Sequence, residues 1–171
     1  GGHSLLAVRL FAQIEKIFGR NIPLTVLFQA PTIEQLTKII RQKGWSAPWS
    51  SLVPIQADGS KPPFFCVPAA ASTALSFEKL ARHLGTDQPV YGLQPLGFEE
   101  GQVPHNRVED MAAYYLKEIR ALQPEGPYYL GGMCFGAFVV FEMAQQLLAQ
   151  GCTVALLALF DPGPPAPPSP F

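Results

Sequence analysis

The first 43 positions hold two segments in which apolar residues recur at helical spacing. The first segment is SLLAVRLFAQIEKIF, residues 4–18, and Ser4 stands at its start where an N-cap belongs. Gly19 follows as a candidate C-cap. The apolar positions that predict one helical face are Leu6, Leu10, Ile14, Ile17 and Phe18. The pattern therefore predicts a helix over residues 4–18.

The second helical segment is TIEQLTKIIRQK, which begins at Thr32. Gln35 comes three residues later, which is the spacing of a capping box, and Gly44 follows the segment as a stop signal. The apolar stripe of this helix consists of Leu36, Ile39 and Ile40. Because two helices need a third element to cover them, the pattern predicts a small, incomplete helical domain over residues 1–44.

From residue 52 onward the pattern changes to alternating strands and helices. The strand candidates are the apolar runs LVPIQA, PFFCVPA, PVYGLQPLG, PYYLGG and VALLALFD, and DGSKP between the first two predicts a hairpin. The helix candidates are LSFEKLARHL, VEDMAAYYLKEIRALQ and AFVVFEMAQQLLAQ. This alternation predicts an α/β fold over residues 52–171, a mostly parallel sheet with helices on both faces. Residues 45–51, WSAPWSS, are predicted to be a linker.

Composition and charge narrow the possible functions. With 48% hydrophobic residues the chain can bury a core, and its net charge of -1 gives no basic surface for nucleic acid or anionic membrane. No segment has the length of a membrane span or the pattern of a signal peptide. The three Cys fit neither a disulfide framework nor a zinc site, so we expect no metal and a reducing, cytoplasmic location.

The stretch YYLGGMCFGAFVVFEM, residues 128–143, holds the strongest chemical signal. Gly132, Cys134 and Gly136 form G-x-C-x-G between a predicted strand and a predicted helix, which is the nucleophile-elbow pattern with Cys in place of Ser. The sharp turn needs glycines because side chains there would collide with the neighbouring strand and helix. The following helix points its N-terminus at the site and favours a thiolate or an oxyanion. The alternative is that Cys134 is a small buried apolar residue.

Other candidate residues surround this elbow. The amide of Phe135 is the first oxyanion donor, and Ala69, in the loop FFCVPAAAST, is the best candidate for the second. Asp161 follows the next strand, and residues at the carboxyl ends of parallel strands share one crevice. On its own, an Asp before a Pro is a common turn former. Cys66 and Cys152 are predicted to be structural.

With these pieces in order, the sequence resembles the end of a nonribosomal peptide synthetase or a related polyketide assembly line. Residues 1–43, with the motif GGHSL, are similar to the second half of an acyl or peptidyl carrier domain, and residues 52–161 to the first part of a type I thioesterase with the α/β-hydrolase fold. The resemblance implies 4′-phosphopantetheine on Ser4 and an acyl or peptidyl thioester substrate. It also implies release by hydrolysis or cyclisation. The implied partners are upstream synthetase domains and a phosphopantetheinyl transferase.

The sequence departs from the family at two points. The family usually has Ser at the position of Cys134. The catalytic residues of the family follow in the order nucleophile, acid and His, and the given sequence has no His after Asp161. His3 belongs to the carrier motif, while His83 and His105 do not occupy the place of a base in that order.

We therefore expect the sequence to be an excerpt of a longer chain. Its catalytic His would lie beyond residue 171, its first carrier helix before residue 1, and it would not turn over efficiently by itself. Two alternatives remain, a non-catalytic carrier-docking module and a stand-alone hydrolase or acyltransferase acting on free esters or acyl-CoA.

Overall fold

The computed structural model describes residues 4–19, 22, 26, 30, 32–41, 51–97 and 103–163. The chain divides into two compact units, residues 1–50 and residues 51–171.

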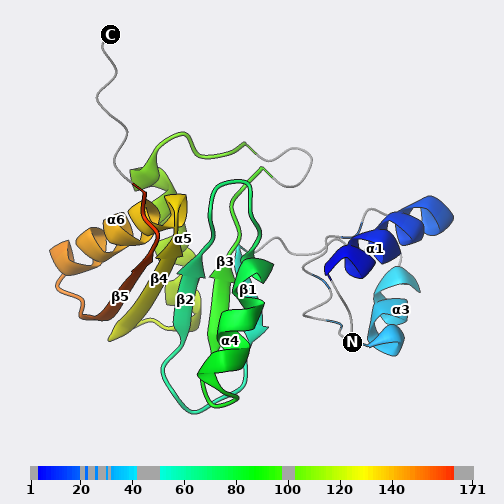
Figure 1. Ribbon diagram of the computed structural model, residues 1–171, viewed down its shortest axis with the longest axis horizontal. Helices are drawn as coiled ribbons and strands as arrows, with labels where there is room; N and C mark the ends of the chain where they lie inside the picture. The colour runs from blue at the N-terminus through cyan, green and yellow to red at the C-terminus, as the bar shows by residue number, and fades with distance from the viewer. Residues whose placement is uncertain are drawn as a thin grey trace, which may run out of the picture. The chain divides into compact units, whose positions relative to one another are not determined.

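The first unit contains helix α1, Ser4–Phe18, and helix α3, Ile33–Arg41, drawn in blue and cyan in Figure 1. Its core consists of Phe11, Ile14, Ile22, Val26, Ala30 and Leu36, with Ile39 and Ile40 packed against it. The predicted stripe of α3 is confirmed. The face predicted for α1 is right at Ile14 and wrong elsewhere, because the helix meets the core through Phe11 and Ile14, one turn apart. The exposed positions are Leu6, Leu10, Ile17 and Phe18.

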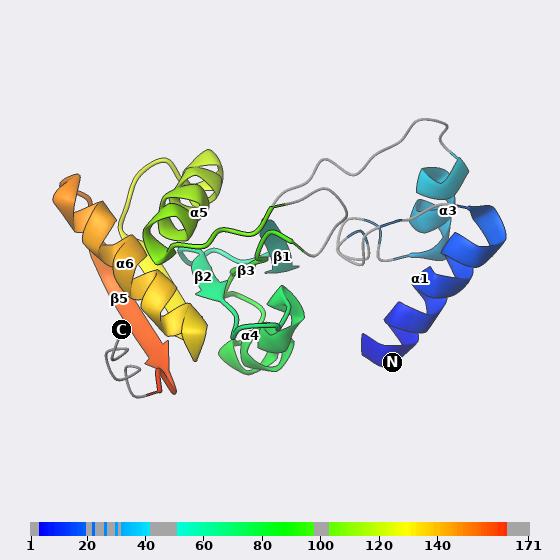
Figure 2. The same ribbon diagram turned by 90° about the horizontal axis from the view of Figure 1, so that it is seen from above.

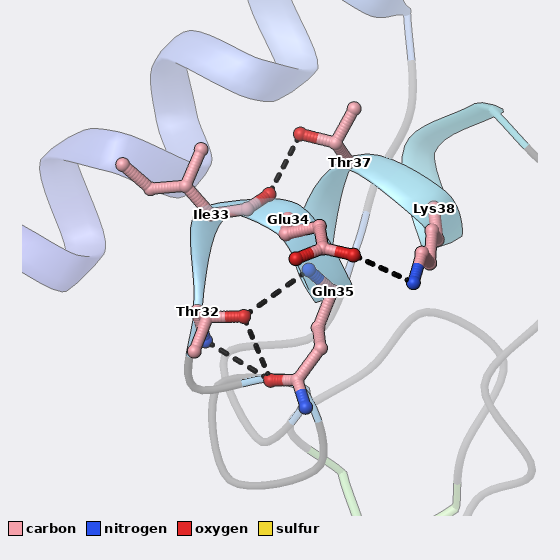
Figure 3. Close-up of polar contacts among 6 residues, drawn as sticks. All are labelled: Thr32, Ile33, Glu34, Gln35, Thr37 and Lys38. Carbon is pink, nitrogen blue, oxygen red and sulfur yellow. Dashed lines mark hydrogen bonds and ion pairs between the residues drawn. The ribbon is translucent and has the colours of Figure 1, made fainter.

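The start of α3 shows the predicted capping box (Figure 3). The Gln35 N–H donates to Thr32 Oγ1 at 3.2 Å, and the Thr32 N–H donates to Gln35 Oε1 at 3.2 Å. Two amides that the helix leaves without partners are thereby satisfied. Lys38 and Glu34 form an exposed ion pair one turn apart, at 2.8 Å. The beginning of α3 is thus fixed by its own sequence.

The second unit is built on a five-stranded sheet in the order β1-β3-β2-β4-β5. The strands are β1 Leu52–Gln56, β2 Phe64–Val67, β3 Val90–Leu93, β4 Tyr128–Met133 and β5 Val154–Phe160. Strands β3, β2, β4 and β5 run parallel, and β1 is antiparallel to β3. The α/β fold with a mostly parallel sheet is therefore confirmed.

The predicted hairpin between β1 and β2 is wrong. β1 pairs with β3, while β2 lies between β3 and β4 as a central strand buried on both faces. The segment DGSKP does not close a tight turn. It crosses to the loop before β3, where the Ser60 N–H donates to Asp87 Oδ1 at 2.8 Å. Gly59 allows this approach, because a Cβ there would meet the Asp87 carbonyl oxygen at 2.5 Å.

Helices cover both faces of the sheet. One face packs on α5, Val108–Leu122, and α6, Phe135–Ala149. The other packs on the 3-10 helix η1, Ala74–Phe77, and α4, Glu78–Leu84. Figure 2 shows α5 and α4 on opposite sides of the strands. β2 supplies both cores by alternation: Phe65 and Val67 face the first pair of helices, and Phe64 and Cys66 face the second.

β5 is less covered than its apolar sequence predicts. Leu156, Leu159 and Phe160 are exposed. β5 is an edge strand of the described sheet and pairs with β4. No helix in the described ranges is long and apolar enough to span a bilayer.

Candidate active site

Cys134 lies at the tight turn between β4 and α6, as the elbow pattern predicts. It has φ 52° and ψ -117°, a conformation that an L-residue with a side chain adopts at a cost of about 1–3 kcal/mol. Its N–H donates to the Phe160 carbonyl at 2.9 Å, which ties the turn to the end of β5. The residue is exposed, so the reading of Cys134 as a buried core residue is wrong. A strained, exposed thiol at the start of a long helix is a suitable nucleophile.

The two glycines of the motif allow close backbone contacts. A Cβ on Gly132 would lie 2.6 Å from Val140 Cγ2 and still nearer to the Gly136 carbonyl oxygen. A Cβ on Gly136 would lie 2.6 Å from the Pro68 carbonyl oxygen, with Val67 closer still. Both positions therefore exclude larger residues. The first turn of α6 is pressed against the end of β2, where the predicted oxyanion loop begins.

The two predicted oxyanion donors flank this contact. Phe135 is the first residue of α6, so its amide has no acceptor within the helix, and Ala69 directly follows Pro68. Neither amide donates a hydrogen bond within the part of the chain that the structure describes. Ala69 belongs to a turn closed by a hydrogen bond from the Ser72 N–H to its carbonyl at 3.1 Å. Two free amides thus border the elbow from different elements.

Asp161 lies beside Cys134 in the sheet register. Met133 and Phe160 are paired in the β4–β5 ladder, and Cys134 and Asp161 each come next in their chains. Asp161 is exposed and has a positive φ of 45°. Its carboxylate and the Cys134 thiol make no hydrogen bond or ion pair with any described residue. The topology therefore brings the predicted nucleophile and acid to the same edge.

The histidines of the described ranges have other contacts. His83 is exposed on α4, where its Nδ1 lies 2.7 Å from the Lys79 carbonyl oxygen. His105 precedes α5 and packs its ring on Tyr114, with centroids 5.2 Å apart. His3 lies outside the described residues.

The remaining cysteines have structural surroundings. Cys66 is fully buried within β2, and this burial raises the pKa of its thiol, which keeps it protonated. Cys152 is half-buried at the turn before β5, where its Sγ accepts from an Arg120 Nη at 3.5 Å. No group of three or more His, Cys, Asp or Glu side chains suited to a metal occurs among the residues described.

Ser4 is the first residue of α1, in the other unit. The first amides of a helix have no partners within it, and the positive end of its dipole favours a phosphate. A phosphodiester on Ser4 therefore fits the position of this residue. The arm of 4′-phosphopantetheine would attach there.

Comparison with known proteins agrees with both parts of this description. Residues 62–169 match the thioesterase domain family, and residues 1–40 match the phosphopantetheine attachment site. The chain belongs to the thioesterase family. In this chain the thioesterase domain follows a phosphopantetheine attachment site.

Relatives of this thioesterase chain share the two-domain pattern. It is 40% identical over 164 residues to a dimodular nonribosomal peptide synthase of Bacillus subtilis, and 39% identical over 165 residues to an indigoidine synthase of Dickeya dadantii. Each match covers 96% of the chain, which spans 7% and 11% of those relatives. The resemblance noted in the sequence is thus confirmed.

Solved structures agree with these relatives. A four-domain nonribosomal peptide synthetase, in its holo form with AMP and glycine, matches with a TM-score of 0.62 and 32% identity, over 91% of this chain and 12% of the other. The NocB thioesterase domain of the nocardicin cluster matches with a TM-score of 0.59 and 30% identity, over 64% of this chain and 49% of its own.

Proposed function

We propose that this chain releases a carrier-bound acyl or peptidyl group at the end of a nonribosomal peptide or polyketide assembly line, with Cys134 as the nucleophile. Residues 1–44 act as the carrier domain, residues 45–51 as the linker and residues 52–171 as the thioesterase. The exposed, strained elbow of Cys134 at the start of α6 is the observation that supports this proposal most directly. Upstream synthetase domains supply the acyl group.

Ser4 holds the 4′-phosphopantetheine arm, which a phosphopantetheinyl transferase installs from coenzyme A. The arm supplies the thiol that carries the acyl group as a thioester. Because carrier and thioesterase belong to one chain, delivery is intramolecular, with an effective concentration on the order of millimolar for a short flexible connection.

Cys134 accepts the acyl group in the first half of the reaction. Its thiolate sulfur attacks the carbonyl carbon of the thioester, and the amides of Phe135 and Ala69 donate to the oxyanion that forms. The bond from that carbon to the arm's sulfur then breaks, and the departing thiolate takes up a proton. One thioester has been exchanged for another, so the acyl group remains activated on the protein.

Release is the second half of the reaction. The oxygen of water, or an internal amine or hydroxyl of the acyl chain, attacks the Cys134 thioester, and the Cys134 thiolate leaves. Water gives a carboxylic acid, whereas an internal nucleophile gives a lactam or lactone. Asp161 serves as the acid that orients a general-base imidazole, in the usual hydrolase order of nucleophile, acid and His.

A short acyl-pantetheine thioester tests the proposal. We expect one acyl group per chain by intact mass and on Cys134 by peptide mapping. The variant Cys134→Ala should abolish the label, and the matched control Cys152→Ala should keep it. Full labelling of Cys134→Ala would refute the assignment of the nucleophile. No label on the parent chain would favour a non-catalytic docking module instead.

The carrier assignment has its own test. Incubation with coenzyme A and a broad-specificity phosphopantetheinyl transferase should add one phosphopantetheine mass to the chain and none to Ser4→Ala. Absence of that mass from the parent chain would favour a stand-alone hydrolase or acyltransferase acting on free esters or acyl-CoA.

A further inference from the structure

The turn that contains Ala69 must be held in a fixed position relative to the strands of the sheet. An oxyanion donor acts only when it is held at hydrogen-bond distance from the position where charge develops. The bond from the Ser72 N–H to the Ala69 carbonyl closes the turn on itself, and Ala71 within it has φ 57°. This internal bond shapes the turn but leaves its position relative to the strands open. The contact of Gly136 with Val67 and Pro68 fixes the chain before Ala69, and a second contact fixes the chain after it.

Ala74, at the start of η1, connects the turn to strand β3. Its N–H donates to the side-chain Oε1 of Gln94 at 2.9 Å, a bond between buried groups. Its body packs on Gly92, where an added Cβ would lie 3.0 Å from the Ala74 Cα. Gly92 and Gln94 are two residues apart along the extended chain and so project on the same side. Gly92 and Gln94 both contact Ala74, which lies five positions after Ala69.

Gln94 is itself firmly held. Its N–H donates to the Ser51 carbonyl at 2.7 Å, just before β1, and the residue is only 4% exposed. Since the Ala74 amide can only donate, Oε1 is the end of the Gln94 side chain that faces it. Its Nε2 is buried and has no partner among the described residues. Among the described residues, the oxygen is therefore the polar atom of this side chain that makes a hydrogen bond.

We propose that Gln94 is a positioning residue of the thioesterase reaction. Its Oε1 fixes Ala74, and through the intervening turn it sets the Ala69 amide opposite the Phe135 amide beside Cys134. Gln94 touches neither the substrate nor the nucleophile. This inference rests on the proposed function, because it assumes that acyl transfer occurs at Cys134 and that Ala69 supplies an oxyanion donor.

The test compares two reactions of the same thiol. Acylation by an acyl-pantetheine thioester builds an oxyanion, whereas alkylation by iodoacetamide displaces iodide and builds none. We expect Gln94→Met, which removes the acceptor and keeps the length of the side chain, to slow acylation of Cys134 by about 10- to 100-fold. The rate of alkylation of Cys134 should stay unchanged.

Gln56→Met is the matched control. Gln56 Nε2 donates to the Gly85 and Gln88 carbonyls at 2.7 and 2.6 Å, and in the β1–β3 ladder it pairs with Val90, at the opposite end of β3 from Gln94. This control removes two side-chain hydrogen bonds, one exposed and one partly buried, without touching the turn. Both of its rates should match those of the parent chain.

Two results would overturn the inference. One is unchanged acylation in a folded Gln94→Met, and the other is a parallel loss of acylation and alkylation, which would indicate general damage. If Gln94→Met does not fold, Gln94→Asn withdraws the acceptor by one methylene, and unchanged acylation there counts against the proposal equally. Persistent labelling of Cys134→Ala would instead refute the proposed function, so the two failures are distinguishable.

Discussion

The contact between Gly136 and the end of β2 predicts the sign of a stability change. Gly136 lies in the first turn of α6, where replacement by Ala would by helix propensity alone stabilise the protein by about 1 kcal/mol. The structure predicts the opposite. A Cβ there would lie 2.6 Å from the Pro68 carbonyl oxygen, and Val67 is nearer still. Both obstacles are backbone atoms, which cannot rotate away as the end of a side chain can.

The size of the effect follows from the two opposing terms. Overpacking of a tight contact costs typically 1–3 kcal/mol, and with backbone on both sides we expect the upper part of that range. Subtracting about 1 kcal/mol of helix propensity leaves a net loss of about 1–2 kcal/mol for Gly136→Ala. The same displacement separates the Ala69 and Phe135 amides, and a shift of 1 Å in an active site can reduce the rate on the order of 100-fold.

Urea unfolding and acylation of Cys134 measure the two effects on one variant. Gly151→Ala is the control, because Gly151 has φ 74° and nothing within 4 Å of an added Cβ. It lies beyond the other end of α6, so it should lose stability through strain while acylation continues at the parental rate. An increase in the stability of Gly136→Ala would refute the packing argument, since propensity alone would then explain the result.

Three further changes have predictable outcomes. In a longer chain that also contains the general-base His, Cys134→Ser should shift the ratio of cyclic to linear product, because an oxyester is less activated than a thioester toward a hindered internal nucleophile; an unchanged ratio in product analysis would contradict this. The Ser60 amide and hydroxyl lower the pKa of Asp87, so this carboxylate contributes stability above its unfolded pKa that is lost as pH falls through the lower folded pKa. The free energy of unfolding, measured with urea, should therefore decrease less from about pH 5 to about pH 3 in Asp87→Asn than in the parent. Thr32→Ala should destabilise the first unit by about 1 kcal/mol in hydrogen exchange of α3, whereas Thr37→Ala, which loses only a bond to the Ile33 carbonyl, should change little.

The sequence predicted those features that depend on neighbouring residues. The capping box of Thr32 and Gln35 is a matter of three positions, and the elbow of Cys134 needs only a strand, two glycines and a helix. Such local patterns are compatible with few other structures, because a glycine or a cap moved by one position would no longer make its contact. The order of strand and helix candidates from residue 52 onward was predictable for the same reason.

Pairing and burial depend on distant residues, and there the sequence was a poorer guide. The apolar strands around DGSKP fit a hairpin equally well, and only the docking of Ser60 on Asp87 and the pairing of β1 with β3 exclude it. The acceptor role of Gln94 cannot be read from PVYGLQPLG, since it requires Ala74, twenty residues earlier. A glutamine directly after an apolar strand that ends at the candidate site was the one signal available.

Backbone strain gives an independent view of the site. In the described ranges three residues other than glycine have a positive φ: Ala71, Cys134 and Asp161. They follow β2, β4 and β5, and they coincide with the proposed oxyanion turn, the proposed nucleophile and the proposed acid. Each such conformation costs of the order of 1–3 kcal/mol and persists only where the surrounding structure imposes it. Their coincidence with the proposed site is what a fold that holds reactive groups in fixed positions would produce.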